Sequence, residues 1–213
     1  MATLSPKSIL GTISGRIGDV VFSSWKGIPY IRAKAVSIKN PKTQAQLDQR
    51  AKFSTIMKFL KPLTIFLRVG FKNDKTPMST FNAAMSYNLK NALKGTYPAY
   101  NLDFSRARVS QGSLPGALNP KVQLTLRGQI EYTWDDNSFE TDSRADDSVL
   151  LVVYNSKKQQ AIYTVDGNQR YRGRQLMTLP FSFEGDEVQC YLGLQNQRQT
   201  VFSNSQFVGE IRI

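Results

Sequence analysis

Apolar residues along the chain follow two different periods. Between residues 43 and 93 they recur every three to four positions, which is typical of amphipathic helices. From about residue 102 they alternate with polar residues over short runs bounded by turn residues, which is typical of strands. We therefore expect an α+β protein in which an N-terminal β-hairpin and two or three helices precede an all-β sandwich.

Residues 9–36 are predicted to form the hairpin, because strand-forming residues there are separated by glycines. The turn is expected at residues 25–29, where Gly27 can adopt a positive φ. Residues 30–35 alternate polar with apolar side chains, which predicts a half-buried strand. The glycines at residues 15–18 lack the third glycine and the following helix of a dinucleotide-binding fingerprint, so they favour a tight turn.

A helix is predicted to start sharply after Pro41, which has no N–H and disfavours a helical residue before it. Thr43 and Gln46 have the spacing of a capping box. Such a cap contributes about 0.5–2 kcal/mol. The apolar stripe that we expect this helix to bury consists of Phe53, Ile56, Met57 and Leu60.

Two more helical segments are expected before residue 100. Residues 62–71 are short and very apolar, so they must be buried either in their own domain or against a partner, and Pro62 either kinks the first helix or opens a new one. A third helix is capped by Ser79 or Thr80 and ends before Gly95. Residues 96–101 are predicted to be a linker between a domain of residues 1–100 and a domain of residues 101–213.

The second domain is predicted to consist of short strands. About seven strands over roughly 110 residues fit an aligned β-sandwich, with Trp134 in its core. An acidic loop at residues 135–147 is expected to be solvated, and so is a basic hairpin tip at residues 170–174. The candidate strands are residues 106–110, 122–126, 130–134, 149–154, 161–165, 175–181, 188–194 and 207–213.

Charge is distributed very unevenly along the chain, whose net charge is +12. Residues 1–100 hold 16 Lys or Arg against three acids, whereas residues 101–213 hold 12 against 13. This asymmetry suggests a polyanion partner for the first half, with nucleic acid as the commonest polyanion and an acidic protein or anionic lipid as alternatives. The residues that we expect to contact it are Lys26, Arg32, Lys34, Lys39, Lys42, Arg50, Lys52, Lys58 and Lys61.

Aromatic residues near these cations are candidates for stacking on single-stranded bases, although packing is an equal alternative for each. They are Trp25, Tyr30, Tyr97 and Tyr100.

Several kinds of chemistry are not expected from this chain. It has no histidine and a single cysteine, Cys190, which we expect to be a buried apolar residue. The acidic loop lacks the spacing of a calcium loop, and no nucleophile-elbow or phosphate-loop motif occurs. We therefore predict no enzymatic activity, cofactor or metal. With no membrane-length apolar run and no secretory signal, we expect a cytoplasmic or virion-associated protein.

Three motifs occur near the N-terminus, namely ISGRIGDVV at residues 13–21, WKGIPYIR at residues 25–32 and NPKTQAQ at residues 40–46. Together they resemble an uncharacterised family common in Bacteroidota. Further matching segments lie at residues 87–92, 114–117, 152–155 and 203–205, and similar N-terminal motifs occur in proteins of phages and mobile elements. The resemblance implies a strand-and-helix region followed by an immunoglobulin- or fibronectin III-like sandwich, and it supplies no catalytic residues.

Two functions follow as hypotheses. The first is a non-enzymatic binding protein whose basic half contacts a polyanion, expected to be DNA or RNA, without base specificity, because no helix-turn-helix or RNA-recognition signature occurs. The second is a structural or assembly protein, such as a virion or cell-surface component, which uses the sandwich for contacts in a homo-oligomer or larger assembly. A carbohydrate-binding sandwich is a third, weaker alternative.

Overall fold

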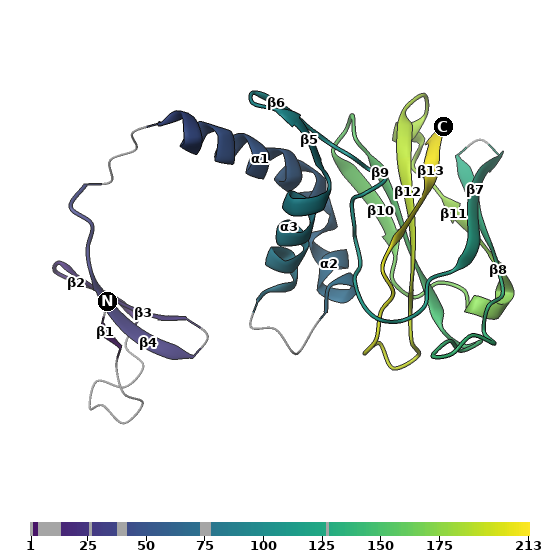
Figure 1. The fold of residues 1–213 in the computed structure, drawn as a ribbon, viewed down its shortest axis with the longest axis horizontal. Helices are drawn as coiled ribbons and strands as arrows, with labels where there is room; N and C mark the ends of the chain where they lie inside the picture. The colour runs from purple at the N-terminus through teal and green to yellow at the C-terminus, as the bar shows by residue number, and fades with distance from the viewer. Residues whose placement is uncertain (1, 4–13, 26, 38–41, 73–77, 127) are drawn as a thin grey trace. The chain divides into compact units, whose positions relative to one another are not determined.

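The computed structural model describes residues 2–3, 14–25, 27–37, 42–72, 78–126 and 128–213 (Figure 1). The protein combines helices with a larger number of strands, as the two sequence periods predict. It forms two compact units, Met1–Thr43 and Gln44–Ile213. The boundary that we predicted after residue 100 lies inside the second unit, so each unit is described separately.

The first unit is a small antiparallel sheet with the strand order β1-β4-β3-β2. The predicted hairpin is β3 and β4, and Gly27 has a φ of 79° in the turn between them. We expected buried and exposed side chains to alternate over residues 30–35, but they do not. Pro29 is the only buried residue among those described in this sheet. The strands are β1 (Ala2–Thr3), β2 (Gly15–Ile17), β3 (Val20–Trp25) and β4 (Ile28–Ala33).

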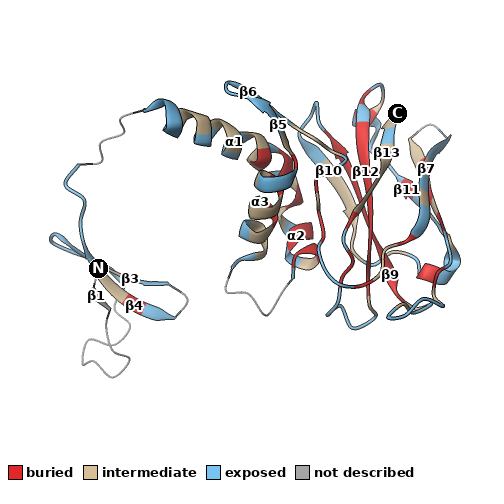
Figure 2. Ribbon diagram, in the orientation of Figure 1, coloured by how far each residue is buried: buried red, intermediate tan, exposed pale blue. Residues whose placement is uncertain are grey.

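The second unit begins with α1 (Gln44–Leu60), which starts directly after Thr43, at the predicted helix start. Its buried residues lie in its C-terminal half, as Figure 2 shows by colour. Phe53, which we expected in the buried stripe, is 44% exposed, whereas Phe59 is buried. The apolar period therefore predicted the helix and the burial of Ile56 and Leu60 correctly, but it placed Phe53 in the buried stripe and left Phe59 out.

Most of the apolar residues that follow α1 are buried within this unit, although Ile65 is 63% exposed. They form the 3-10 turn η1 (Lys61–Leu63), with Pro62 in its first turn, and the helix α2 (Thr64–Gly70). Leu63, Phe66 and Leu67 are buried, and the ring of Phe66 lies 5.6 Å from that of Tyr163. This segment therefore needs no partner molecule to cover it.

Helix α3 (Thr80–Asn91) starts as predicted, since the Ser79 hydroxyl accepts a hydrogen bond from the Asn82 N–H at 3.3 Å. It ends earlier than predicted and is followed by a hairpin of β5 (Leu93–Thr96) and β6 (Ala99–Leu102). Gly95 is part of this hairpin and has a φ of 92°. The residues that we expected to be a linker are therefore a paired structure.

Seven strands form two antiparallel sheets, one in the order β10-β9-β12-β13 and the other in the order β11-β8-β7. Trp134 and Cys190 are buried, as expected. The strands are β7 (Leu118–Leu126), β8 (Gln129–Asp135), β9 (Ser148–Asn155), β10 (Gln160–Thr164), β11 (Arg174–Thr178), β12 (Glu187–Gln195) and β13 (Gln206–Arg212). Two short 3-10 turns, η2 (Arg170–Arg172) and η3 (Phe181–Phe183), flank β11.

The strand that we predicted at residues 106–110 is absent, and the segment is irregular. Side chains bind its backbone in place of a partner strand. The Asn88 amide accepts from the Arg108 N–H and donates to the Arg108 carbonyl, each at 2.9 Å. The Ser205 hydroxyl accepts from the N–H groups of Val109 and Ser110, at 2.9 and 3.3 Å. Because these groups are satisfied in this way, the alternating sequence does not require a strand.

The second unit consists of three layers: helices, the four-stranded sheet and the three-stranded sheet (Figure 1). The central strand β9 is buried over its whole length. Leu150 and Val152 pack with the helices, whereas Leu151 and Val153 pack with the three-stranded sheet. A strand covered on both faces has a continuous apolar sequence, which residues 149–154 show.

Candidate polyanion-binding surfaces

Five of the nine predicted contact residues belong to the first unit. Arg32 and Lys34 are exposed at the end of β4 and just beyond it. Lys42 is also exposed and has a φ of 48°. Lys26 and Lys39 lie outside the described residues.

The other four predicted residues lie on α1 and η1 of the second unit. Arg50, Lys58 and Lys61 are exposed. Arg50 and Lys58 are eight residues apart, so they are about 80° apart around the helix. They form a broad basic side of α1 rather than a narrow row.

The charge of Lys52 is already paired with an acid. Its Nζ lies 2.7 Å from Oδ2 of Asp48 and 5.3 Å from the ring centre of Tyr100. The Tyr100 hydroxyl donates to Oδ1 of Asp48 at 2.5 Å. The Lys52 ammonium, followed by this hydroxyl, lowers the pKa of Asp48, and hydrogen bonding to Asp48 raises the pKa of Tyr100. Lys52 is therefore less available to a partner than an unpaired cation would be.

The four aromatic candidates also differ in exposure. Trp25 is 65% exposed and Tyr97 is 38% exposed, whereas Tyr30 and Tyr100 are partly buried. The hydroxyl of Tyr100 is occupied by Asp48.

A second concentration of cations lies where sequence analysis placed no site. Two cavities of about 830 and 400 Å³ share Tyr87, Lys90, Asn91 and Arg108 as lining residues, so they adjoin each other. Residues 105–113 and 200–207 supply much of the remaining lining. We call this surface the basic groove and define it by its four cations, Lys72, Lys90, Arg106 and Arg108.

Separate elements place these four side chains. Lys90 is in the last turn of α3, and Lys72 follows α2. Arg106 and Arg108 lie on the irregular segment that Asn88 fixes. Sequence analysis missed the groove because it treated residues 106–110 as a strand. One signal was present, since residues 75–102 contain no acid.

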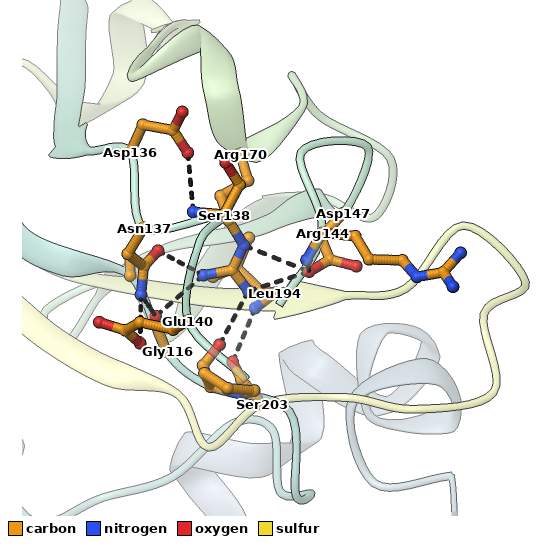
Figure 3. A network of polar contacts seen from close by, with 12 residues as sticks. Gly116, Asp136, Asn137, Ser138, Glu140, Arg144, Asp147, Arg170, Leu194 and Ser203 are labelled. Atoms are coloured by element: carbon orange, nitrogen blue, oxygen red, sulfur yellow. Dashed lines mark hydrogen bonds and ion pairs between the residues drawn. The ribbon is translucent and has the colours of Figure 1, made fainter. Parts of the chain in front are cut away.

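Arg170, from the basic cluster that we expected at a solvated tip, is completely buried (Figure 3). Its Nε and Nη2 donate to Oδ2 of Asp147 at 3.2 and 3.1 Å. Its Nη1 donates to Oδ1 of Asn137 at 2.6 Å and to the Gly116 carbonyl at 3.1 Å, and Nη2 also donates to the Pro115 carbonyl at 3.0 Å. All five N–H groups of the guanidinium are used, so this arginine cannot contact a partner.

The rest of this basic cluster follows the expectation. Tyr171, Arg172 and Arg174 are exposed. The carbonyls of residues 115 and 116, which belong to one of the matching segments, accept from Arg170 and have a structural role.

The acidic loop is only partly solvated. Asp147 is buried by its pairing with Arg170, which corrects our expectation, whereas Asp135, Asp136, Glu140 and Asp142 are exposed. Among the residues that the structure describes, no group of three or more Asp, Glu, Cys or His residues could hold a metal ion.

Comparison with known proteins gives a family but no activity. No curated protein matches the chain. Within the described part of the chain, no helix is long and apolar enough to cross a membrane. A model described as a family of unknown function, DUF6266, matches residues 12–209, which is nearly the whole chain. The resemblance to an uncharacterised family is thus confirmed at that level, and the chain belongs to the DUF6266 family.

Proposed function

We propose that the protein is a non-enzymatic binding protein that contacts nucleic acid through exposed cations without base specificity. The observation that carries this proposal is the surface position of those cations. Six of the seven predicted contact residues that the structure describes are exposed, whereas Lys52 is partly buried and paired with Asp48. Residues 44–100 hold nine Lys or Arg against two acids, so few carboxylates are available within this segment to neutralise them.

Phosphate is the anion that this arrangement suits best. Exposed lysines and arginines neutralise phosphates and release counterions, which gives affinity without reading bases.

A salt titration tests the proposal. We expect fluorescence anisotropy with several unrelated oligonucleotides to give similar affinities. The logarithm of the binding constant should fall linearly with the logarithm of salt concentration, by about 0.9 per phosphate contacted on duplex DNA and about 0.7 on single strands. A salt-independent binding constant, or no binding, would contradict the proposal.

A charge-reversed variant and a matched control test the assignment of residues. Arg32→Glu, Lys34→Glu, Arg50→Glu and Lys58→Glu together should weaken binding about uniformly across sequences and reduce the salt slope. Lys121→Glu, Arg172→Glu, Arg174→Glu and Arg212→Glu change the net charge equally at exposed positions in the sandwich. Equal weakening by both sets would show a response to net charge alone, which would contradict these sites.

We also propose that the seven strands form an immunoglobulin- or fibronectin III-like sandwich. The strand order supports this, because the first, second and fifth strands share one sheet and the remaining four share the other. The fourth strand, β10, pairs with the third, β9, instead of joining the first sheet as in constant-type immunoglobulin domains. An experimental structure compared with both classes would test this.

An assembly protein is a second candidate, and one observation favours it. In the first unit, the apolar residues Ile17, Trp25 and Ile28 are all more than half exposed. The burial of Leu63, Phe66 and Leu67 weakens the case for a partner at the other apolar segment, in which Ile65 is 63% exposed. Light scattering over a concentration series should show a discrete small species for a binding protein and growing particles for a building block.

A further inference from the structure

We propose that the basic groove is the binding site for the phosphate backbone of single-stranded nucleic acid. This inference rests on the proposed polyanion binding and specifies where the strand lies. It concerns four cations that charge counting alone did not single out.

The first argument is charge. Among the described residues that line the two adjoining cavities, no carboxylate occurs. Neither Lys72 nor Lys90 has an ion pair with a described residue, and Nε of Arg106 is 4.0 Å from Oδ2 of Asp103, at the outer limit of an ion pair. Among the described residues, these positive charges lie in one groove with no carboxylate in its lining, and a polyanion would neutralise them.

The second argument is the fixed position of Arg108. Its guanidinium lies 4.5 Å from the ring centre of Tyr87, and its Nη1 donates to Oδ1 of Asn204 at 3.0 Å. Its backbone is held by the completely buried Asn88. An arginine oriented in this way keeps its remaining N–H groups for a second acceptor, and its planar fork matches the geometry of a phosphate.

The third argument is the character of the other lining residues. Gln111 and Ser113 offer an amide and a hydroxyl group of the kind that contact phosphate and sugar. Met78 and Val201 are 49% and 36% exposed and provide apolar surface on which bases can pack. Arg108 already covers the ring of Tyr87, so we expect no base on that ring.

The size of the groove favours a single strand over a duplex. Its two cavities have volumes of about 830 and 400 Å³. Both volumes are within the range of pockets that hold small ligands, about 300–1,000 Å³. A single strand can enter such a groove with its phosphates along the cations. A duplex is too thick to enter, and it is instead read by elements that insert into its own grooves.

The test compares the full chain with two triple variants. The groove variant carries Lys72→Gln, Lys90→Gln and Arg106→Gln, none of which removes a short structural contact. The control variant carries Lys121→Gln, Arg174→Gln and Arg212→Gln, three exposed positions in the sandwich with the same change of charge. Circular dichroism first establishes that both variants fold.

We expect the groove variant to bind a 12-nucleotide single strand at least about tenfold more weakly and the salt slope to fall by about 2, with the control close to the unmodified protein. Duplex binding should fall much less. Equal binding by the groove variant and the unmodified protein would overturn the groove assignment and leave the proposed function intact. If the unmodified protein binds neither form of nucleic acid, the proposed function itself fails.

Inorganic polyphosphate of matched charge is the third ligand in the test, after the single strand and the duplex. It offers phosphates without bases. We expect it to bind more weakly than the oligonucleotide, since it lacks groups to pack on Met78 and Val201. Equal affinity for the two ligands would overturn the assignment to nucleic acid.

Discussion

Arg170 connects loops that lie far apart in the sequence. Its guanidinium contacts the backbone of residues 115 and 116, the Asn137 side chain and the Asp147 carboxylate (Figure 3). Removing a guanidinium from water is costly, and it is tolerated only where good acceptors compensate each N–H group. At this site, all five have one.

Replacement of Arg170 by methionine should strongly destabilise the protein. It would leave the Asp147 carboxylate buried without its cation, and Oδ1 of Asp147 already has no hydrogen-bond partner. Removing one partner of a buried pair costs about 3–5 kcal/mol. We expect urea denaturation to show a loss of this size in the free energy of unfolding. The control is Arg172→Met, two residues away and exposed, for which we expect a change within about 0.5 kcal/mol. Similar losses in the two variants would show that the Arg170 contacts are not stabilising.

Asp186 predicts a dependence of stability on pH. Hydrogen bonds from Lys158, Asn155 and Lys157 hold the pKa of its carboxyl well below its usual range. Because the pKa is lower in the folded than in the unfolded state, this contribution to stability is complete above the unfolded value of 3.8 and is lost as the pH falls towards the folded value. Asp186→Asn should therefore lower stability clearly at pH 7 and less at pH 3 by urea unfolding. A difference that does not shrink on acidification would contradict this.

Among the elements, the pairing of α3 with the irregular segment after it depends on one amide. Asn88 is buried, and it binds both backbone groups of Arg108 as well as the Ala84 carbonyl at 2.9 Å. Asn88→Leu would leave the backbone N–H and carbonyl of Arg108 unpaired, at about 1–3 kcal/mol for each buried group. We expect thermal denaturation to show this loss.

Asn91→Leu is the matched control for stability alone, because Asn91 also lines the basic groove; it lies three residues further along α3, where its exposed side chain donates to the Tyr87 carbonyl. Its effect should be within about 0.5 kcal/mol. If Asn88→Leu also weakens binding of single strands, the link from this amide through Arg108 to the basic groove is supported.

The elements also show what sequence could and could not predict. The alternation of apolar residues predicted β8 correctly because alternate side chains of this strand are buried. It also predicted β12, although the side chains on both faces of that strand are buried. Residues 106–110 alternate as well, yet side chains distant in the sequence, Asn88 and Ser205, bind their backbone. Local periodicity cannot reveal such competitors.

The candidate sites divide in the same way. The exposure of Arg50 and Lys58 could be predicted from composition and helical period, because both positions lie off the apolar side of α1. The basic groove combines α2, α3 and two later segments, so only the folded chain brings its cations together. Burial of Arg170 depends on Asp147, 23 residues earlier, and sequence gave no sign of this pairing.

In the molecule as a whole, the two hydrophobic clusters lie entirely within Gln44–Ile213. We therefore expect a chain lacking residues 1–43 to fold and to melt within a few degrees of the full chain. Its salt slope for nucleic acid should be smaller, since residues 1–43 hold seven Lys or Arg against one acid. Failure of this shortened chain to fold, assessed by circular dichroism, would contradict the division.

The burial of β9 on both faces has a consequence for anyone preparing fragments of this protein. A fragment starting after residue 100 would keep both sheets but uncover Leu150, Val152 and Tyr191, which the helices now shield. Large uncovered apolar surfaces promote aggregation. Such a fragment should accumulate in inclusion bodies, whereas a fragment starting at Gln44 should stay in the soluble fraction of the lysate. Expression trials could therefore establish that the helices are needed to cover the four-stranded sheet.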